Sequence, residues 1–147
     1  MRIARYEIRP CLQPMRDAQW KFARAAVARL EGHVLVLEDE RGNRGLGYIH
    51  SIPAITGPGA ANRAATEWLC ESLAGRTIGD LGALADEIDA SLALNPSAKA
   101  GVDMALHDLR ARRDGVTVGA LLGGARRDTI ALSRIVPIKS PAEMATA

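Results

Sequence analysis

Residues 98–109 read Ala98-Lys99-Ala100-Gly101-Val102-Asp103-Met104-Ala105-Leu106-His107-Asp108-Leu109. The apolar side chains in this run recur at the spacing of one buried helix face. They are Ala98, Val102, Ala105, Leu106 and Leu109. Asn95-Pro96 is a helix start signal, because Asn is a common cap and Pro fits the first turn. With Gly115 as a stop, the pattern predicts a helix over 96–114.

A glycine-rich turn and a new strand-and-helix pair follow this helix. The turn reads Gly115-Val116-Thr117-Val118-Gly119-Ala120-Leu121-Leu122-Gly123-Gly124 and leads to Arg127-Asp128. Thr129 to Ile138 is then predicted as a strand, and Ser140-Pro141-Ala142-Glu143 is a capping box that opens a helix. Strand followed directly by helix is the repeating unit of a (β/α)8 barrel. We therefore place a domain boundary near Asp128, with one domain over 1–128 and the start of a barrel over 129–147.

The runs at 98–109 and 115–128 resemble the enolase superfamily, in its mandelate racemase and muconate lactonizing enzyme branch. In that family an A-x-D-x-A-L-W-D-L-like helix and a G-V-P-V-x-x-L-L-G-G-like turn close the N-terminal capping domain and lead into the first barrel strand. His107 stands where the family usually has Trp, and Thr117 where it usually has Pro. The resemblance covers nearly the whole chain in order of elements, and it is specific over residues 98–147.

The resemblance implies an activity and a cofactor for the complete enzyme. Members of the family abstract a proton alpha to a carboxylate, and Mg2+ stabilises the resulting enediolate while Lys or His acts as the base. The outcome is racemization, epimerization, cycloisomerization or dehydration of a small carboxylate substrate. The family's catalytic lysines and metal carboxylates lie on later barrel strands, so we assign no catalytic and no metal residue here. We expect this chain alone to be inactive, as a capping domain with a truncated barrel.

The first fifty residues predict a three-stranded antiparallel sheet. Ile3 to Leu12 is predicted as an edge strand because of its prolines, and Pro14 to Lys21 as a loop. The apolar runs Val34–Leu37 and Gly45–Ile49 flank Gly42-Asn43 and predict a β-hairpin. The acidic residues at its tip are interpreted as solvated surface. They are Glu38, Asp39 and Glu40.

Helical periodicity begins after the sheet. One predicted helix runs over 60–73 and ends before Gly75, and a second begins after the N-cap Asp80. The apolar stripe expected for the first of these is Ala61, Ala64, Ala65, Trp68, Leu69 and Leu73. Strands first and helices after are typical of the α+β class, here a three-stranded sheet followed by a helical bundle.

Two loops and one strand end supply the candidate substrate contacts. The family resemblance implies mobile loops over the barrel mouth, here at roughly Pro14–Phe22 and His50–Thr56, and active sites of such barrels lie at the C-terminal strand ends. The candidates are Met15, Trp20, Phe22, His50, Ile52, Ile138 and Lys139. Each assignment has an alternative. Trp20 and Phe22 could instead pack their loop onto the domain, and Lys139 could instead be a solvated lysine ahead of the helix cap.

Composition limits the remaining possibilities. Nineteen basic against seventeen acidic side chains give no nucleic-acid footprint, and no apolar run is long enough for a membrane span. Cys11 and Cys70 are isolated, so we expect a reducing, cytoplasmic setting. Pairing of the 130–138 strand between copies would produce a homo-oligomer. The competing interpretation is a free-standing, non-catalytic α+β binding or interaction module, in which 129–147 would be ordered against its own sheet.

Overall fold

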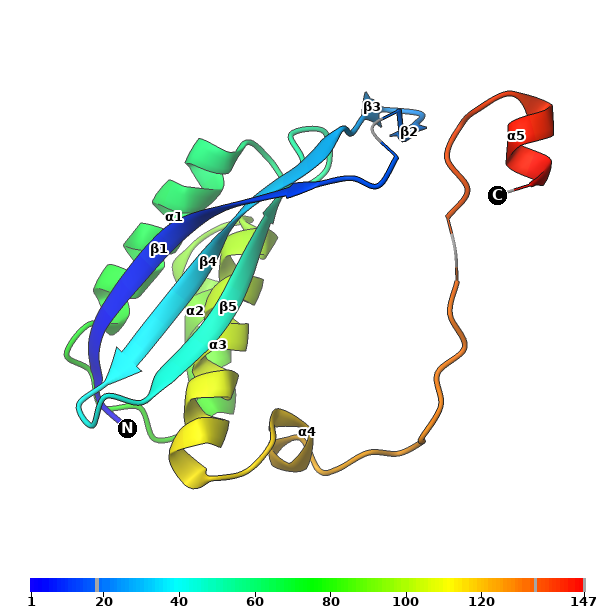
Figure 1. The fold of residues 1–147 in the computed structure, drawn as a ribbon. Helices are drawn as coiled ribbons and strands as arrows, with labels where there is room; N and C mark the ends of the chain where they lie inside the picture. Colours follow the sequence, from blue (N-terminus) through cyan, green and yellow to red (C-terminus); the bar gives the residue numbers. More distant parts are fainter. Residues whose placement is uncertain (18, 134, 147) are drawn as a thin grey trace.

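The computed structural model describes residues 1–17, 19–133 and 135–146. Its sheet consists of β1 (Ile3–Pro14), β4 (Arg29–Asp39) and β5 (Arg44–Ser51), ordered β1-β4-β5 with every pair antiparallel. β4 is central, and Leu35 lies opposite both Ile8 of β1 and Gly47 of β5. The edge strand and the hairpin expected from the sequence are both confirmed (Figure 1).

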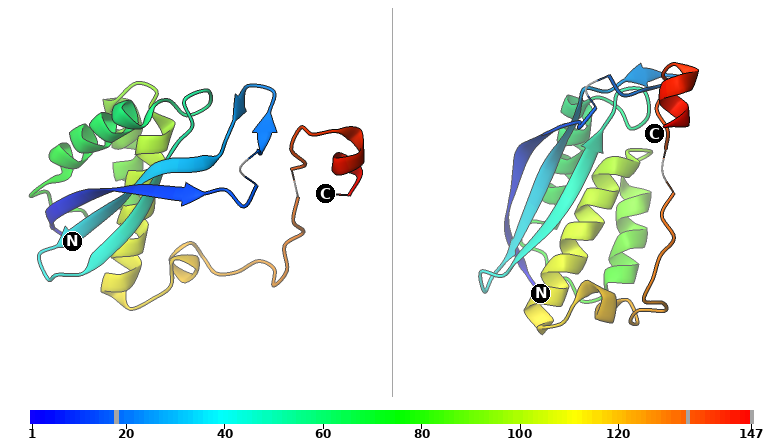
Figure 2. Two further views of the ribbon diagram at one scale, coloured as in Figure 1. Left: turned by 45° about the horizontal axis from the view of Figure 1, so that its top comes forward. Right: turned by 45° about the vertical axis from the view of Figure 1, so that its right-hand side comes forward.

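Helices cover one face of this sheet and leave the other uncovered (Figures 1 and 2). They are α1 (Gly59–Leu73), α2 (Leu81–Ser91) and α3 (Pro96–Asp114). Two short helices follow, α4 (Val118–Leu121) and α5 (Pro141–Ala145). Asp80 caps α2 as expected, because its carboxylate accepts hydrogen bonds from the amides of Gly82 and Ala83. The α+β class is therefore confirmed, with the helices following the strands in the sequence.

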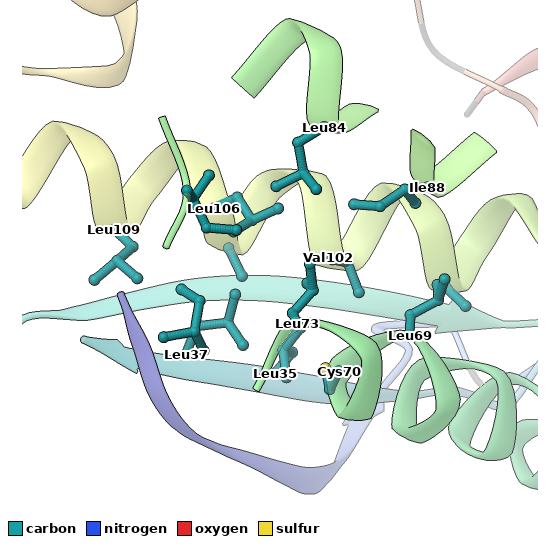
Figure 3. Packing of buried hydrophobic residues seen from close by; sticks show 14 of the residues in the cluster. Leu35, Leu37, Leu69, Cys70, Leu73, Leu84, Ile88, Val102, Leu106 and Leu109 are labelled. Atoms are coloured by element: carbon teal, nitrogen blue, oxygen red, sulfur yellow. The ribbon is translucent and has the colours of Figure 1, made fainter. Parts of the chain in front are cut away.

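The core fills the space between the sheet and the helices (Figure 3). Leu35 and Leu37 of β4 point into it and are fully buried, as alternation along a one-face strand requires. The side chains that meet them come mainly from α1 and α3. These are Leu69, Cys70, Leu73, Val102, Ala105, Leu106 and Leu109. The apolar face predicted for α3 is thus confirmed.

The buried face of α1 is displaced from the predicted stripe. Leu69 and Leu73 are buried as expected, but Trp68 is 47% exposed, and the polar Asn62 and Thr66 are buried instead. The prediction was wrong here because it counted only apolar side chains. Asn62 satisfies its amide with hydrogen bonds to the loop after β5, so a polar residue can occupy the inner face.

Helix α3 lies directly on β5 because both elements carry glycine where they touch. A Cβ placed on Gly47 would lie 1.8 Å from the carbonyl oxygen of Gly101, far inside van der Waals contact. The same helix also reaches the free edge of β5. The amide of Leu46 donates a 2.9 Å hydrogen bond to the carboxylate of Asp108.

The acidic tip of the β4–β5 hairpin is not uniformly solvated, which corrects the sequence interpretation. The side chain of Asp39 is fully buried and accepts hydrogen bonds from the amides of Arg41 and Asn43. Arg113 at the end of α3 forms ion pairs with Asp39 at 3.2 Å and Glu40 at 2.8 Å. The tip is therefore fixed to α3 by charge-assisted bonds.

The strand expected over Thr129 to Ile138 is absent from the described residues 129–133 and 135–138, and residue 134 lies outside them. A strand needs a neighbouring strand to bond its amides and carbonyls, and among these described residues only Ile138 forms a backbone bond to one, from its amide to the Lys21 carbonyl. The segment is extended and its side chains are exposed, with Ile130 at 75% and Leu132 at 94%. It runs away from the sheet toward the β2–β3 region, rather than onto the sheet as a free-standing module would require (Figure 2). The Ser140–Glu143 capping box is present as predicted, while residue 147 lies outside the described part.

Three further local features differ from the sequence expectations. The predicted loop over Pro14 to Lys21 leads into a small hairpin of β2 (Lys21–Phe22) and β3 (Ala25–Ala26) that the sequence did not predict, and the turn after Gly115 contains α4. Asn95 precedes α3 as expected, but it adopts a left-handed conformation (φ 55°) and its side chain makes no capping bond. The helix starts where Pro96 allows it, since proline tolerates the first turn without an amide.

Candidate functional site

Two connecting segments approach each other at one end of the sheet, where β4 begins and β5 ends. The first contains the β2–β3 hairpin and is closed by backbone bonds from Met15 N to Ala28 O at 3.1 Å and from Val27 N to Trp20 O at 2.8 Å. The second follows β5 and is a turn in which the Thr56 amide donates to Ile52 O at 2.8 Å. Both segments are therefore held by their own hydrogen bonds.

A groove of about 470 Å³ lies between these segments. Its walls come from residues 24–29 and 31 on one side and residues 51–54 on the other. Small apolar residues form most of the lining, including Ala25, Ala26 and Ala28. This shape and lining suit a small ligand that is oriented by a few polar groups.

Positive charge is available at the groove. Arg29 is paired with Glu31 at 2.8 Å, so that arginine is already matched by a carboxylate. Arg24 also lines the groove, is exposed, and forms no ion pair within residues 1–17, 19–133 and 135–146. A guanidinium in this position can bind a carboxylate through two parallel hydrogen bonds. The sequence interpretation missed Arg24, although an arginine beside Ala25 and Ala26, next to a predicted loop, is a pattern that could have indicated an anion contact.

Trp20 and Phe22 of the first segment lie close together, whereas Ile52 and His50 of the second segment lie in different surroundings. The rings of Trp20 and Phe22 are 5.6 Å apart and tilted by 53°. Ile52 lines the groove as anticipated. His50 is opposite Gly32 in the sheet, and its ring lies 6.2 Å from that of Tyr48, outside the groove lining. Met15 is half-buried at the start of the first segment.

The structure brings the two strand-end candidates to the first segment. The amide of Ile138 donates to the carbonyl of Lys21 at 2.9 Å. The ammonium of Lys139 lies 2.6 Å from a carboxylate oxygen of Asp17. Residues more than a hundred positions apart in the sequence therefore meet at this end of the molecule, near β2 (Figure 1).

Asn62 is a positioning residue that sequence reasoning did not find. Its amide nitrogen lies 3.2 Å from His50 O, 3.0 Å from Ser51 Oγ and 3.4 Å from Gly57 O. It is only 2% exposed, so these bonds tie α1 to both ends of the second segment. A lone Asn at the start of an alanine-rich helix was the only signal in the sequence.

Within the described residues, the chain does not supply a metal site. No group of three or more His, Cys, Asp or Glu side chains converges there. The residues present therefore do not fit the Mg2+ ion that the family resemblance implies. Among the described helices, none has the length and apolar character that crossing a bilayer demands.

Comparison with known proteins shows clear similarity. Residues 8–123 match the family described as "Mandelate racemase / muconate lactonizing enzyme, N-terminal domain". The L-Ala-D/L-Glu epimerase of Clostridium acetobutylicum is 32% identical over 127 residues, covering 85% of this chain and 35% of that protein.

Solved structures agree with this similarity. The substrate-liganded L-Ala-D/L-Glu epimerase from Bacillus subtilis superimposes with a TM-score of 0.89 at 30% identity, covering 99% of this chain and 41% of that one. The dipeptide epimerase from Cytophaga hutchinsonii, solved with Mg and the dipeptide D-Ala-L-Val, shares the fold with a TM-score of 0.89 at 22% identity, over 99% of this chain and 40% of its own. The chain thus spans about two fifths of the length of these proteins or less.

Proposed function

The chain belongs to the mandelate racemase and muconate lactonizing enzyme family, and on this basis we propose that it caps the active site of an enzyme that removes a proton alpha to a carboxylate. The observation that carries the proposal is the meeting of three segments at one end of the domain: the β2–β3 hairpin, the turn after β5, and residues 138–139. Active sites of (β/α)8 barrels lie at the C-terminal strand ends, which is where Ile138 and Lys139 would be placed. We therefore retain the division into a capping domain over 1–128 and the start of a barrel over 129–147.

The substrate is proposed to be a small carboxylate of the amino-acid or dipeptide type. Arg24 brings an exposed guanidinium to the groove, and a substrate carboxylate is its natural partner. The apolar lining would exclude water, and exclusion of water strengthens that electrostatic contact. The proposed contacts around the ligand are Met15, Trp20, Phe22, Ile52 and Ile138, with Arg24 added. His50 lies outside the groove lining, and the charge of Lys139 is already matched by Asp17, so these two candidates are not proposed as contacts.

The chemistry itself is assigned to residues outside this chain. A proton beside a carboxylate is very weakly acidic, so its removal needs a strong base and concentrated positive charge near the forming dianion. In the complete enzyme Mg2+ is proposed to supply that charge. The residues of this chain would orient the substrate, close the site to water and hold no metal ligand.

The proposal also covers the location of the protein and the association of its copies. A cytoplasmic location is supported by the two free thiols, Cys11 and Cys70. For the 147-residue chain by itself we propose a homo-oligomer, because Ile130, Leu132 and Ile135 are exposed and a second copy would cover them.

The test is proton exchange at the alpha carbon. The complete protein that carries this N-terminal sequence is incubated with a panel of dipeptides in D2O and Mg2+, and the alpha proton is followed by 1H NMR. We expect loss of that signal with at least one dipeptide, and no loss once EDTA is added.

Two controls sharpen the result. Arg24→Met should raise KM by about tenfold, since one charge-assisted contact contributes about 1.5 kcal/mol, while the 147-residue chain alone should show no exchange. Dipeptide binding without exchange by the complete protein would favour the non-catalytic binding module. Exchange by the 147-residue chain alone would contradict the assignment of the chemistry to other residues.

A further inference from the structure

One ion pair joins the two ends of the described chain at the candidate site. The Lys139 ammonium lies 2.6 Å from Asp17 Oδ2, and the two side chains are only 26% and 33% exposed. The residues are separated by most of the sequence, so the pair closes a very large loop. A pair that is partly shielded from water keeps more of its attraction than a fully exposed one.

Asp17 is held in place from its own side of the contact. Its second carboxylate oxygen accepts a 3.0 Å bond from the amide of Gln19, and its carbonyl accepts a 3.1 Å bond from the amide of Trp20. The carboxylate is therefore presented by a tight turn that leads directly into β2. Pairing with Lys139 therefore costs little conformational entropy at Asp17, because the turn already fixes that residue.

A backbone bond reinforces the ion pair from the other side. The amide of Ile138 donates to the carbonyl of Lys21, which is the first residue of β2. The segment before it has few supports of its own, since Ile130, Leu132 and Ile135 are 72% to 94% exposed. The contacts at 138–139 therefore help to hold the described part of this segment beside the hairpin.

We propose that Asp17 and Lys139 are positioning residues that fasten the β2–β3 hairpin to the chain at residues 138–139. In this arrangement Lys139 acts through Asp17 and not through a substrate anion, because its charge is already matched. The segment that contains the hairpin carries the packed rings of Trp20 and Phe22 and, in the groove, Arg24, so fixing it fixes the groove wall. Only the consequence for catalysis rests on the proposed function, since the fastening itself is a property of this chain.

The physical test uses the 147-residue chain and measures amide hydrogen exchange of Ile138 by NMR. Lys139→Met and Asp17→Asn each remove one charge, and each should speed exchange about twofold to fivefold, as expected for a partly exposed pair. The matched controls are Lys21→Met, whose side chain makes no ion pair in the described residues, and Asp86→Asn on α2. Both controls should leave the exchange rate of Ile138 unchanged.

A second measurement reports on the hairpin. Trp68→Phe leaves Trp20 as the only tryptophan, and its emission should shift in Lys139→Met but not in Lys21→Met. The swapped pair, Asp17→Lys with Lys139→Asp, should restore Ile138 exchange to within twofold of the parent. Unchanged exchange in both single variants, or single effects that simply add in the double variant Asp17→Asn with Lys139→Met, would overturn the proposal.

Failure of this proposal is distinguishable from failure of the proposed function. In the complete enzyme, Lys139→Met should raise KM severalfold with little change in kcat, because it loosens the groove wall without touching the reacting atoms. If the complete protein shows no alpha-proton exchange, the enzyme assignment is refuted. The role of the Asp17–Lys139 pair would still be decided by the amide hydrogen exchange of Ile138. A kcat that falls a hundredfold with KM unchanged would instead assign Lys139 a direct part in the chemistry and would refute the positioning role.

Discussion

Replacing Asn62 with alanine should destabilise the domain and release the turn that forms one wall of the groove. Asn62 is buried, and its amide bonds His50 O at 3.2 Å and Ser51 Oγ at 3.0 Å, with a longer contact of 3.4 Å to Gly57 O. Each neutral hydrogen bond contributes about 1 kcal/mol net, and a buried acceptor left unpaired costs about 1–3 kcal/mol. Two good bonds and one unpaired acceptor together give an expected loss of about 3–5 kcal/mol in the free energy of unfolding.

The measurement combines urea unfolding with hydrogen exchange of the Ile52 amide. Because that amide donates to Thr56 Oγ1 inside the turn, its exchange should accelerate by more than the global destabilisation explains. Asn95→Gly is the matched control, since it removes an exposed amide contact and glycine accepts the left-handed backbone of that site. A loss below about 0.5 kcal/mol in Asn62→Ala, or one equal to the control, would refute the role assigned to Asn62.

Three further outcomes follow from the packing and the charges. Gly47→Ala should lower the free energy of unfolding, measured in urea, by at least about 3 kcal/mol, because its Cβ would lie 1.8 Å from the carbonyl oxygen of Gly101. Gly79→Ala is the control: its Cβ would meet open space, so the loss should stay under about 0.5 kcal/mol. The hydrogen bond from Arg113 lowers the pKa of Glu40 from 4.5 to about 2. The stability that this pair gives the fold should therefore be fully present above pH 4.5 and lost as the pH falls toward 2, and the acid unfolding curve of Arg113→Met should lack that pH-dependent loss. Burial raises the pKa of Cys70 to about 12, so a thiol reagent at pH 8 should label only the other cysteine until urea is added; labelling of both in the native protein would contradict the buried position.

The sequence predicted the parts of the fold whose signals are local. Asp80 caps α2 and Gly115 ends α3 at a positive φ of 69°, and both were readable from residue type alone. The apolar face of α3 was also correct, because its spacing is unambiguous. The buried face of α1 was predicted only in part: Leu69 and Leu73 are buried as expected, but Asn62 and Thr66 share that face. No local pattern reveals that the Asn62 amide will find partners in a distant loop.

The candidate site is formed by contacts between residues far apart in the sequence, and the sequence alone could not predict those contacts. The loop assignment placed Trp20 and Phe22 in one segment, and their rings do pack together. Nothing in the sequence joined Asp17 to Lys139 or placed Arg24 opposite the turn after β5, since both follow from tertiary packing. The strand expected at 129–138 failed for the same reason, because a strand exists only where another strand is available to bond it.

The bond between the Leu46 amide and Asp108 has a consequence for how copies of this domain can associate. Edge strands are the usual place where sheets grow by recruiting a strand from another molecule. Here a side chain from the neighbouring helix already occupies a donor of that edge, and Arg112 holds the carboxylate from 2.9 Å away. An incoming strand would have to displace a charged group before gaining its first backbone bond, so assembly by sheet extension at β5 is disfavoured and contacts between copies are directed to other surfaces.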